Sequence, residues 1–219
     1  IMNRLFHSYQ PYKGPLPGRT NGVLIANEAG EAVAYAMFNL EDRGPMGFTL
    51  AEAARLAGVS AAAPYRHFAG RDELLEEVAR QGFEEFAERL EAALAVGRTS
   101  PLAAFLNMGR AYLRFAAERR GFYIAMFESG ISITGNAALT QAADRARGVL
   151  VTAAEALFQR SAAPRPPAGM VADHIWALSH GVVELFGRGK PGGRSPISAE
   201  DMLESGALIY LRGLGVIPD

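Results

Sequence analysis

Apolar residues recur every three or four positions over most of the chain from Phe48 onward, which is the period of an amphipathic α-helix. The clearest case is the stretch 71–96, where apolar residues fall on every turn. Asp72 and Glu73 stand at its start, where acidic side chains suit the positive end of a helix dipole. No segment competes with a clear strand pattern of alternating apolar and polar residues. The pattern therefore predicts an all-α protein.

Residues that begin and end helices divide the chain into nine predicted helices. Ser60, Ser100 and Ser198 can cap free backbone N–H groups at a helix start, and Pro101 suits the first helical position. The predicted helices are 23–43, a helix beginning at Thr49 and ending before Gly58, a short helix after Ser60, 71–96, 101–121, 123–128, 136–158, 168–186 and 199–213. Three prolines within residues 1–20 forbid a continuous helix there, so this stretch is predicted to be an extended arm.

The stretch from Phe48 to Leu75 carries the most specific pattern in the chain. Thr49 and Glu52 form a capping box, and Gly58 ends the first short helix. Two short helices around a glycine turn make a helix-turn-helix, whose second helix fits the major groove of DNA. The alternative interpretation is a helical hairpin that only packs and does not contact DNA.

A Gly-Val-Ser turn, then Tyr65-Arg66-His67-Phe68 and Arg71-Asp72-Glu73-Leu74, resembles the DNA-binding motif of the TetR family of transcriptional repressors. The resemblance implies a three-helix DNA-binding head over residues 21–70. It also implies a larger helical body over residues 71–219, which carries the dimer interface and an inducer pocket. Family members usually begin with a basic run leading directly into the first helix, and residues 1–20 depart from that pattern.

Eight residues in and around the second helix of the motif are the predicted DNA contacts. The resemblance assigns phosphate contacts to Thr49, Tyr65, His67 and Arg71. The residues placed to approach base edges are Ser60, Ala61, Ala62 and Arg66. An alanine methyl can contact a thymine methyl, and arginine can read guanine. The predicted target is a palindromic operator, bound by a dimer with half-sites about one helical turn apart.

The predicted body is rich in aromatic and methionine residues. Trp176, His180 and Gly181 resemble the Trp-His-Gly signature of one C-terminal subclass of the family. The candidate ligand-binding residues are Phe86, Phe105, Met108, Tyr112, Phe115, Phe122, Met126, Phe127, Trp176 and His180. Any single one of them is more often plain core. Together they fit a largely apolar cavity with a few polar groups, which predicts a small apolar or aromatic effector.

The last two predicted helices, 168–186 and 199–213, are apolar on more than one face. In the second of them Met202, Gly206 and Ile209 lie beside the main stripe. A helix needs only one stripe to join its own core, so the second stripe predicts a homodimer through these two helices. The alternative is that the second stripes pack against other helices of the same subunit.

Composition and motifs narrow the function classes. A net charge of −1 argues against general polyanion binding, while 58–71 contains Arg66 and Arg71 and no acid, which suits specific DNA contact. No cysteine is present, and His174 and His180 stand about 120° apart on a helix, so neither a metal nor another cofactor is predicted. Neither a phosphate-binding loop nor a nucleophile elbow occurs, and no enzyme activity is predicted.

No apolar run approaches membrane-spanning length and no signal-peptide pattern is present, so a cytoplasmic protein without a membrane partner is expected. The rival hypothesis is a small-molecule-binding helical protein, or an enzyme, that does not bind DNA.

Overall fold

A computed structural model describes residues 68–96, 100–159, 166–187 and 196–217 with their side chains. Before Phe68 it describes the backbone of 22–26 and 32–36 and the single positions or short runs 44, 49–51, 60, 62 and 65. The chain divides into two compact units, which are described separately. The first unit is Ile1–Gly82 with Arg119–Asn136, and the second unit is Phe83–Glu118 with Ala137–Asp219.

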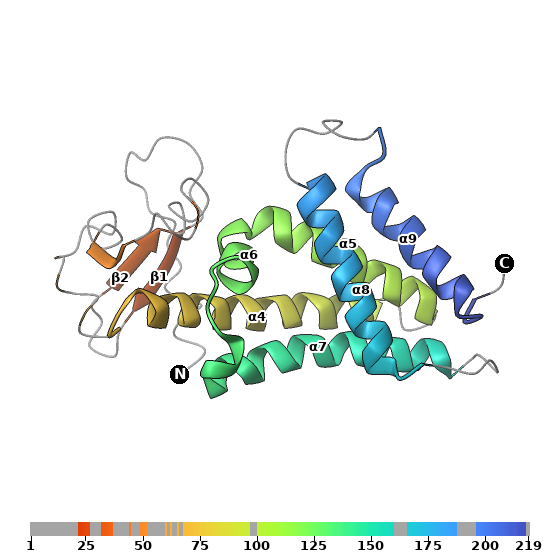
Figure 1. The fold of residues 1–219 in the computed structure, drawn as a ribbon, viewed down its shortest axis with the longest axis horizontal. Helices are drawn as coiled ribbons and strands as arrows, with labels where there is room; N and C mark the ends of the chain where they lie inside the picture. The colour runs from red at the N-terminus through yellow and green to blue at the C-terminus, as the bar shows by residue number, and fades with distance from the viewer. Residues whose placement is uncertain are drawn as a thin grey trace. The chain divides into compact units, whose positions relative to one another are not determined.

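Helices account for the described residues after Phe68, apart from their connections (Figure 1). They are α4 (Arg71–Val96), α5 (Pro101–Glu118), α6 (Arg120–Phe127), α7 (Ala137–Phe158), α8 (Ala168–Val182) and α9 (Ala199–Gly213). A 3₁₀ turn, Ile133–Gly135, precedes α7, and a π-helical turn, Val183–Gly187, continues α8. The predicted all-α fold class is confirmed in this part of the chain.

The prediction of a first helix over 23–43 is wrong. The backbone there forms β1 (Gly22–Ala26) and β2 (Ala32–Ala36), an antiparallel pair with Gly22 opposite Ala36. The signal was present in the sequence, since β-branched and aromatic residues stand at alternate positions in both segments and Asn27 and Gly30, which turns favour, lie between them. The predicted arm over 1–20 lies outside the described residues.

Two predicted helix starts are confirmed in detail. The N–H of Ala103 donates to Oγ of Ser100 at 3.3 Å, and the N–H of Asp201 donates to Oγ of Ser198 at 3.0 Å. The Ser198 hydroxyl also donates to Oδ2 of Asp201 at 2.7 Å, so the Asp201 carboxylate bonds the serine side chain as well. Each cap satisfies a backbone donor that the first helical turn leaves free.

Helix α4 contributes its apolar stripe to both units. The stripe follows the helical period, and its large apolar residues are buried as far as Leu90: Leu74, Leu75 and Val78 in the first unit and Phe83, Phe86 and Leu90 in the second. Leu94, one turn further on, is half-buried. Burial of such side chains is the main favourable term that holds a helix in a tertiary structure.

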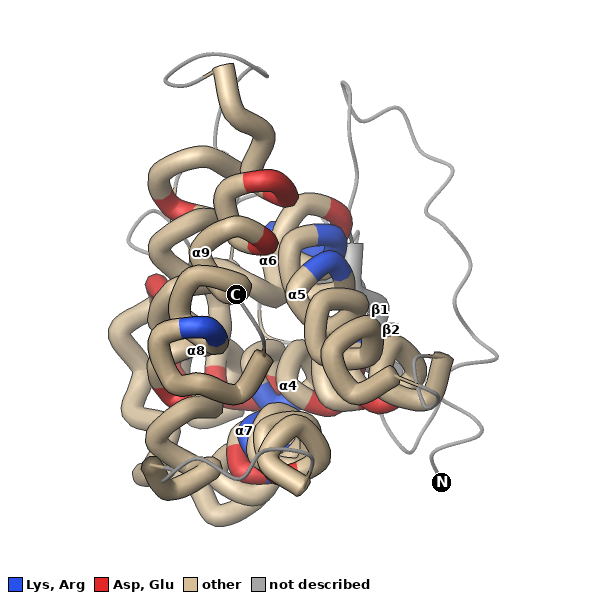
Figure 2. The backbone as a smooth tube through the Cα atoms, turned by 90° about the vertical axis from the view of Figure 1, so that its right-hand side faces the viewer, with Lys and Arg blue, Asp and Glu red and all other residues tan. Residues whose placement is uncertain are grey.

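In the second unit α8 packs against α7 and α9, and α9 packs against α5 (Figure 1). Ion pairs join several of these helices at the surface: Arg147 with Asp173 (2.7 Å, α7 to α8), Arg145 with Glu91 (2.8 Å, α7 to α4) and Arg89 with Glu118 (2.7 Å, α4 to α5). The Arg147 hydrogen bond lowers the pKa of Asp173. Figure 2 shows the acidic and basic positions interspersed along the helices.

In the first unit α6 lies close against α4 at Gly82. A methyl group at Gly82 would lie 2.7 Å from Sδ of Met126 and 3.1 Å from Cβ of Phe122. Asn136 is the last residue of the segment 119–136, which contains α6. Its Nδ2 donates to Oε2 of Glu76 on α4 at 3.1 Å. The segment 119–136 therefore holds the first half of α4 at two points.

The Gly82 packing predicts a contrast between two glycine-to-alanine substitutions in helices. At Gly148, in α7, an added methyl meets nothing within 4 Å, so Gly148→Ala should raise the free energy of unfolding by about 1 kcal/mol through helix propensity. Gly82→Ala gains the same propensity and loses about 1–3 kcal/mol to overpacking. Urea unfolding followed by circular dichroism measures both. Equal stabilisation by the two substitutions would contradict the close α4–α6 packing.

Candidate functional site

Five of the eight predicted DNA-contacting residues are described. Four are exposed: Thr49, Ser60, Ala62 and Tyr65. Ala61, Arg66 and His67 lie outside the described residues. Two apolar neighbours in the same stretch, Leu50 and Phe68, are buried. A helix pair that reads DNA needs polar and small side chains on its outer face and apolar side chains against its core. The roles of the individual residues stay predictions.

Arg71 stands at the first position of α4 and is half-buried. Its Nη1 donates to Oδ1 of Asp72 at 2.8 Å, and Asp72 is largely exposed. Glu73 accepts a hydrogen bond from the backbone N–H of Ala69 ahead of the helix. Exposed ion pairs of this kind contribute little stability.

Four of the predicted ligand-binding residues form one group in the second unit, here named the aromatic cluster: Phe86, Tyr112, Phe115 and Trp176. The ring of Phe86 lies at its centre. Its centroid is 5.1 Å from that of Tyr112, 5.0 Å from Phe115 and 6.1 Å from Trp176. Helices α4, α5 and α8 thus bring together side chains that are far apart in the sequence. All but the half-buried Trp176 are fully buried.

The remaining predicted ligand residues do not all join this cluster. Phe105 and Met108 are buried on α5, and His180 is half-buried on α8, all three in the second unit. Phe122, Met126 and Phe127 lie on α6 and belong to the first unit. The sequence could not separate these sets, because the same apolar pattern marks a helix in either unit.

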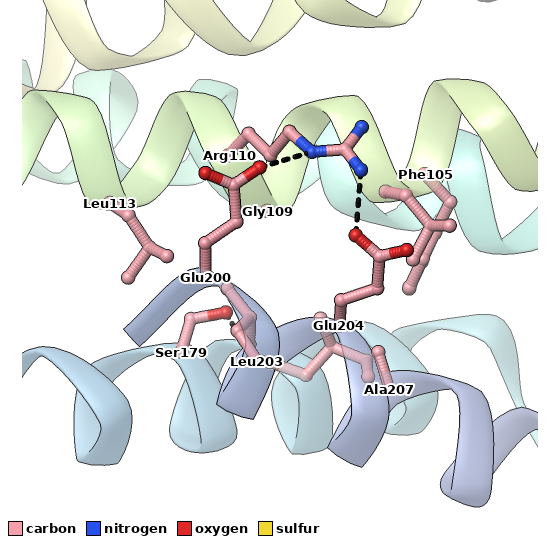
Figure 3. Close-up of a pocket in the computed structure, with 11 residues that line it drawn as sticks. Phe105, Gly109, Arg110, Leu113, Ser179, Glu200, Leu203, Glu204 and Ala207 are labelled. Atoms are coloured by element: carbon pink, nitrogen blue, oxygen red, sulfur yellow. Dashed lines mark hydrogen bonds and ion pairs between the residues drawn. The ribbon is translucent and has the colours of Figure 1, made fainter. Parts of the chain in front are cut away.

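The second unit contains a narrow crevice between α5, α8 and α9, with a cavity volume of about 20 Å³, which is room for about one water molecule (Figure 3). Its lining residues are Phe105, Leu106, Gly109, Arg110, Leu113, Ile175, Ser179, Glu200, Leu203, Glu204 and Ala207. Phe105 is the only predicted ligand residue among them. The sequence carried one signal for the crevice: Glu200 and Glu204 are four residues apart and so share a helix face.

Arg110 reaches from α5 to both glutamates of α9 (Figure 3). Its Nε donates to Oε1 of Glu200 at 2.6 Å and its Nη2 to Oε2 of Glu204 at 2.6 Å, while Nη1 donates to Oδ1 of Asn107 at 3.2 Å. The hydrogen bond to Glu200, more than any other contact, raises the pKa of Arg110. The mouth of the crevice therefore carries two carboxylates and one guanidinium.

In the described part of the chain, no group of three or more His, Asp or Glu side chains could hold a metal ion. His174 lies 2.7 Å, through Nδ1, from the hydroxyl of Tyr210. Among the described helices none is both long and apolar enough to cross a bilayer.

Comparison with known families matches two parts of the chain. Residues 33–78 match the family described as bacterial regulatory proteins, tetR family, and residues 105–207 match the family described as tetracyclin repressor-like, C-terminal domain. The first match contains all eight predicted DNA contacts, and the second contains α6 to α8 and most of α5 and α9.

Solved structures share the fold. A protein of unknown function from Rhodococcus sp. RHA1 is 26% identical with a TM-score of 0.68, over 81% of this chain and 90% of that one. The TetR family regulator PfmR from Thermus thermophilus is 20% identical with a TM-score of 0.64, over 81% of this chain and 95% of that one. AibR, solved with isovaleryl coenzyme A and operator DNA, is 16% identical with a TM-score of 0.60, over 79% of this chain and 92% of that one.

A different similarity covers a short part of the chain. The large ribosomal subunit assembly factor BipA of Synechocystis is 54% identical over 44 residues, which is 20% of this chain and 7% of that protein. The chain thus spans only a small fraction of the length of this relative.

The aromatic cluster predicts the cost of a core truncation. Phe115 is completely buried, so Phe115→Ala should lower the free energy of unfolding by about 3–5 kcal/mol if the cluster is close-packed. Val96→Ala, at a position that is 81% exposed, should change it by less than about 0.5 kcal/mol. Urea unfolding at a fixed protein concentration measures both. A cost below about 2 kcal/mol at Phe115 would indicate that its ring lines an existing cavity.

Proposed function

Because the chain belongs to the TetR family of transcriptional regulators, we propose that it binds operator DNA as a homodimer and releases it when a small apolar or aromatic effector binds. The observation that carries the proposal is the family match over 33–78, which contains every predicted DNA contact. The exposure of Thr49, Ser60, Ala62 and Tyr65 supports it. Repression is the expected direction, no catalytic step is required, and the site of action is the cytoplasm, where the operator is.

Helices α8 and α9 are the proposed dimer interface. Exposed or half-buried residues repeat at helical spacing on the outer face of each: Met170, His174, Ala177, Gly181 and Leu185 from α8 into its π turn, and Met202, Ser205 and Ile209 on α9. Ile209 is 68% exposed, Leu185 53% and Met170 49%, although all three are large and apolar. A two-fold copy of the same pair of helices would cover them and close the assembly.

Gly206 does not belong to that outer face. A methyl group there would lie 3.2 Å from Cδ2 of Leu178, so the glycine allows α9 to approach α8 within one subunit. At Gly206, therefore, the second apolar stripe of α9 packs against another helix of the same subunit, which is the alternative to a dimer contact. Ile209 is therefore the residue on which the dimer proposal depends.

Helix α4 is the proposed link between effector and DNA. The aromatic cluster, the proposed effector site, takes Phe86 from α4, and the same helix begins at Arg71 beside the DNA-reading stretch. Segment 119–136 packs against the first half of α4 at Gly82 and is hydrogen-bonded to it at Glu76. If α4 has two alternative positions, an effector that binds one of them more tightly shifts the equilibrium toward it. Operator affinity changes only if the two positions also differ in their affinity for DNA, as linkage requires. AibR, which shares this fold, was solved with both isovaleryl coenzyme A and operator DNA, and this supports the pairing of a small-molecule effector with DNA binding.

One observation favours the rival hypothesis of a small-molecule-binding helical protein without DNA binding. The strands β1 and β2 occupy part of the segment where the first helix of the head was predicted. A head without that helix would lack the brace that holds the helix-turn-helix. Measuring operator affinity and effector affinity separately distinguishes the two functions, because the rival retains only the second.

The DNA proposal predicts different effects for two arginines. Arg66→Ala should weaken operator binding and relax the preference at one base position by about 1–3 kcal/mol. Arg71→Ala should weaken all sequences alike and reduce the salt dependence by about one phosphate contact. Titrations of operator and scrambled duplexes at several salt concentrations measure both effects. Wild-type affinity in the double variant would exclude this helix pair as the DNA-binding element.

The dimer proposal predicts that Ile209→Arg yields a monomer, because the interface would bury a charge without a partner. Operator affinity should then fall at least tenfold, since the two heads are no longer linked. Val96→Arg is the matched control, because Val96 is also β-branched, apolar and exposed but lies on α4. Light scattering at micromolar concentration gives the mass. A tight dimer in the Ile209→Arg variant would place the interface elsewhere.

A further inference from the structure

We propose that an open groove between the last turns of α4 and the second half of α5 binds a small monocarboxylate with an apolar body. Its cavity volume is about 410 Å³, which lies within the range of small-molecule pockets. All the residues that line it belong to the second unit, and none of them belongs to the aromatic cluster. The groove is therefore separate from the proposed effector site, and its ligand goes beyond the proposed function.

The apolar part of the groove lining consists of three short side chains and one larger exposed one. Ala92, Ala93 and Val96 lie on α4, and Ala111 lies on α5. Because alanine side chains are short, they leave a space between the two helices that longer side chains would fill. Val96 is 81% exposed, so an apolar body that covers it removes apolar surface from water.

Arg89 lines the groove, but its guanidinium is already engaged. Its Nη2 lies 2.7 Å from Oε1 of Glu85, and its Nη1 donates to Oε2 of Glu118 at 2.7 Å. Its guanidinium carbon lies 5.6 Å from the ring centroid of Phe115. Two carboxylates and an aromatic face thus hold this arginine, so it is not the group that would bind an anion.

Arg114 is the cation of the groove that remains available. It is exposed, and within the part of the chain that the structure describes no carboxylate pairs with its guanidinium. Glu118, four residues further along α5, binds Arg89 on α4 instead. A carboxylate on a bound molecule would give Arg114 a planar partner, which its forked N–H groups can bind through two hydrogen bonds.

Direct contact, and not a general field, should select the charge of the ligand. Two positive and two negative side chains meet at the groove and their charges sum to zero: Arg89, Arg114, Glu85 and Glu118. A monocarboxylate that reaches Arg114 gains a charge-assisted hydrogen bond while its apolar body lies over Val96. A dianion such as a phosphate ester would be repelled more strongly by the two glutamates, so a single negative charge fits best.

The first test locates the probe. The chain has no cysteine, so a single introduced thiol can report on the groove. In the full chain with Val96→Cys, 4-phenylbutanoate at millimolar concentration should slow modification by the neutral reagent N-ethylmaleimide several-fold, because the bound probe covers the thiol. Ala103→Cys is the matched control, since Ala103 is exposed on α5 and does not line the groove. No protection at Val96→Cys, or equal protection of both thiols, would overturn the proposal.

The second test measures the charge preference by isothermal titration calorimetry with three probes of one shape: 4-phenylbutanoate, 4-phenylbutanol and 4-phenylbutylamine. The carboxylate should bind about tenfold more tightly than the alcohol, and the amine should not exceed the alcohol. Arg114→Gln should remove the preference for the carboxylate. Arg212→Gln is the control, because Arg212 is also exposed but lies on α9. A preference that persists in Arg114→Gln, or that Arg212→Gln removes equally, would overturn the proposal.

Ala92→Leu provides a variant without a charge change. Ala92 is exposed, so the leucine can fill the groove without entering the core, and helix propensity changes little. Carboxylate binding should be lost while circular dichroism and the unfolding temperature stay close to wild type, and Ala103→Leu should leave binding unchanged. Unchanged binding in a folded Ala92→Leu protein would contradict the placement of the probe. None of these measurements uses DNA, so their outcome is independent of whether the chain binds an operator.

Discussion

The apolar stripe of α4 is the constraint on which both compact units depend. Its large apolar residues from Leu74 to Leu90 are buried, three of them in each unit. A single continuous helix therefore contributes to the cores of both units. The glycine at the unit boundary, Gly82, is where α6 packs most closely on this helix.

Charged residues on the second unit join helices rather than support the core. Arg147, Arg145, Arg89 and Arg110 each pair with a carboxylate on a neighbouring helix. Surface pairs of this kind add little to stability, but they restrict how adjacent helices slide. Arg110 differs from the others because its two partners stand at the mouth of a crevice with apolar walls.

The sequence predicted the features that residues within one or two helical turns determine, such as helix starts and apolar stripes. It missed the features that depend on residues far apart in the chain. Caps such as Ser198 and the period of the α4 stripe gave the helix positions within a few residues, since both act within one or two turns. The strand pair β1–β2 was missed because a helical interpretation was preferred for a segment that also alternates with period two. The crevice could not be found, because Arg110 and Glu204 are 94 residues apart and meet only in the folded chain.

The chain thus combines a regulator-like part, which solved structures cover over about four-fifths of its length, with a short similarity to BipA. The central claim is that it reads DNA as a two-fold dimer. Selection of binding sites from a random duplex pool with the full chain, followed by sequencing, tests that claim most directly. The account predicts enrichment of an inverted repeat with half-site centres about one helical turn apart. A pool with no enriched sequence, or with a single unrepeated half-site, would contradict it.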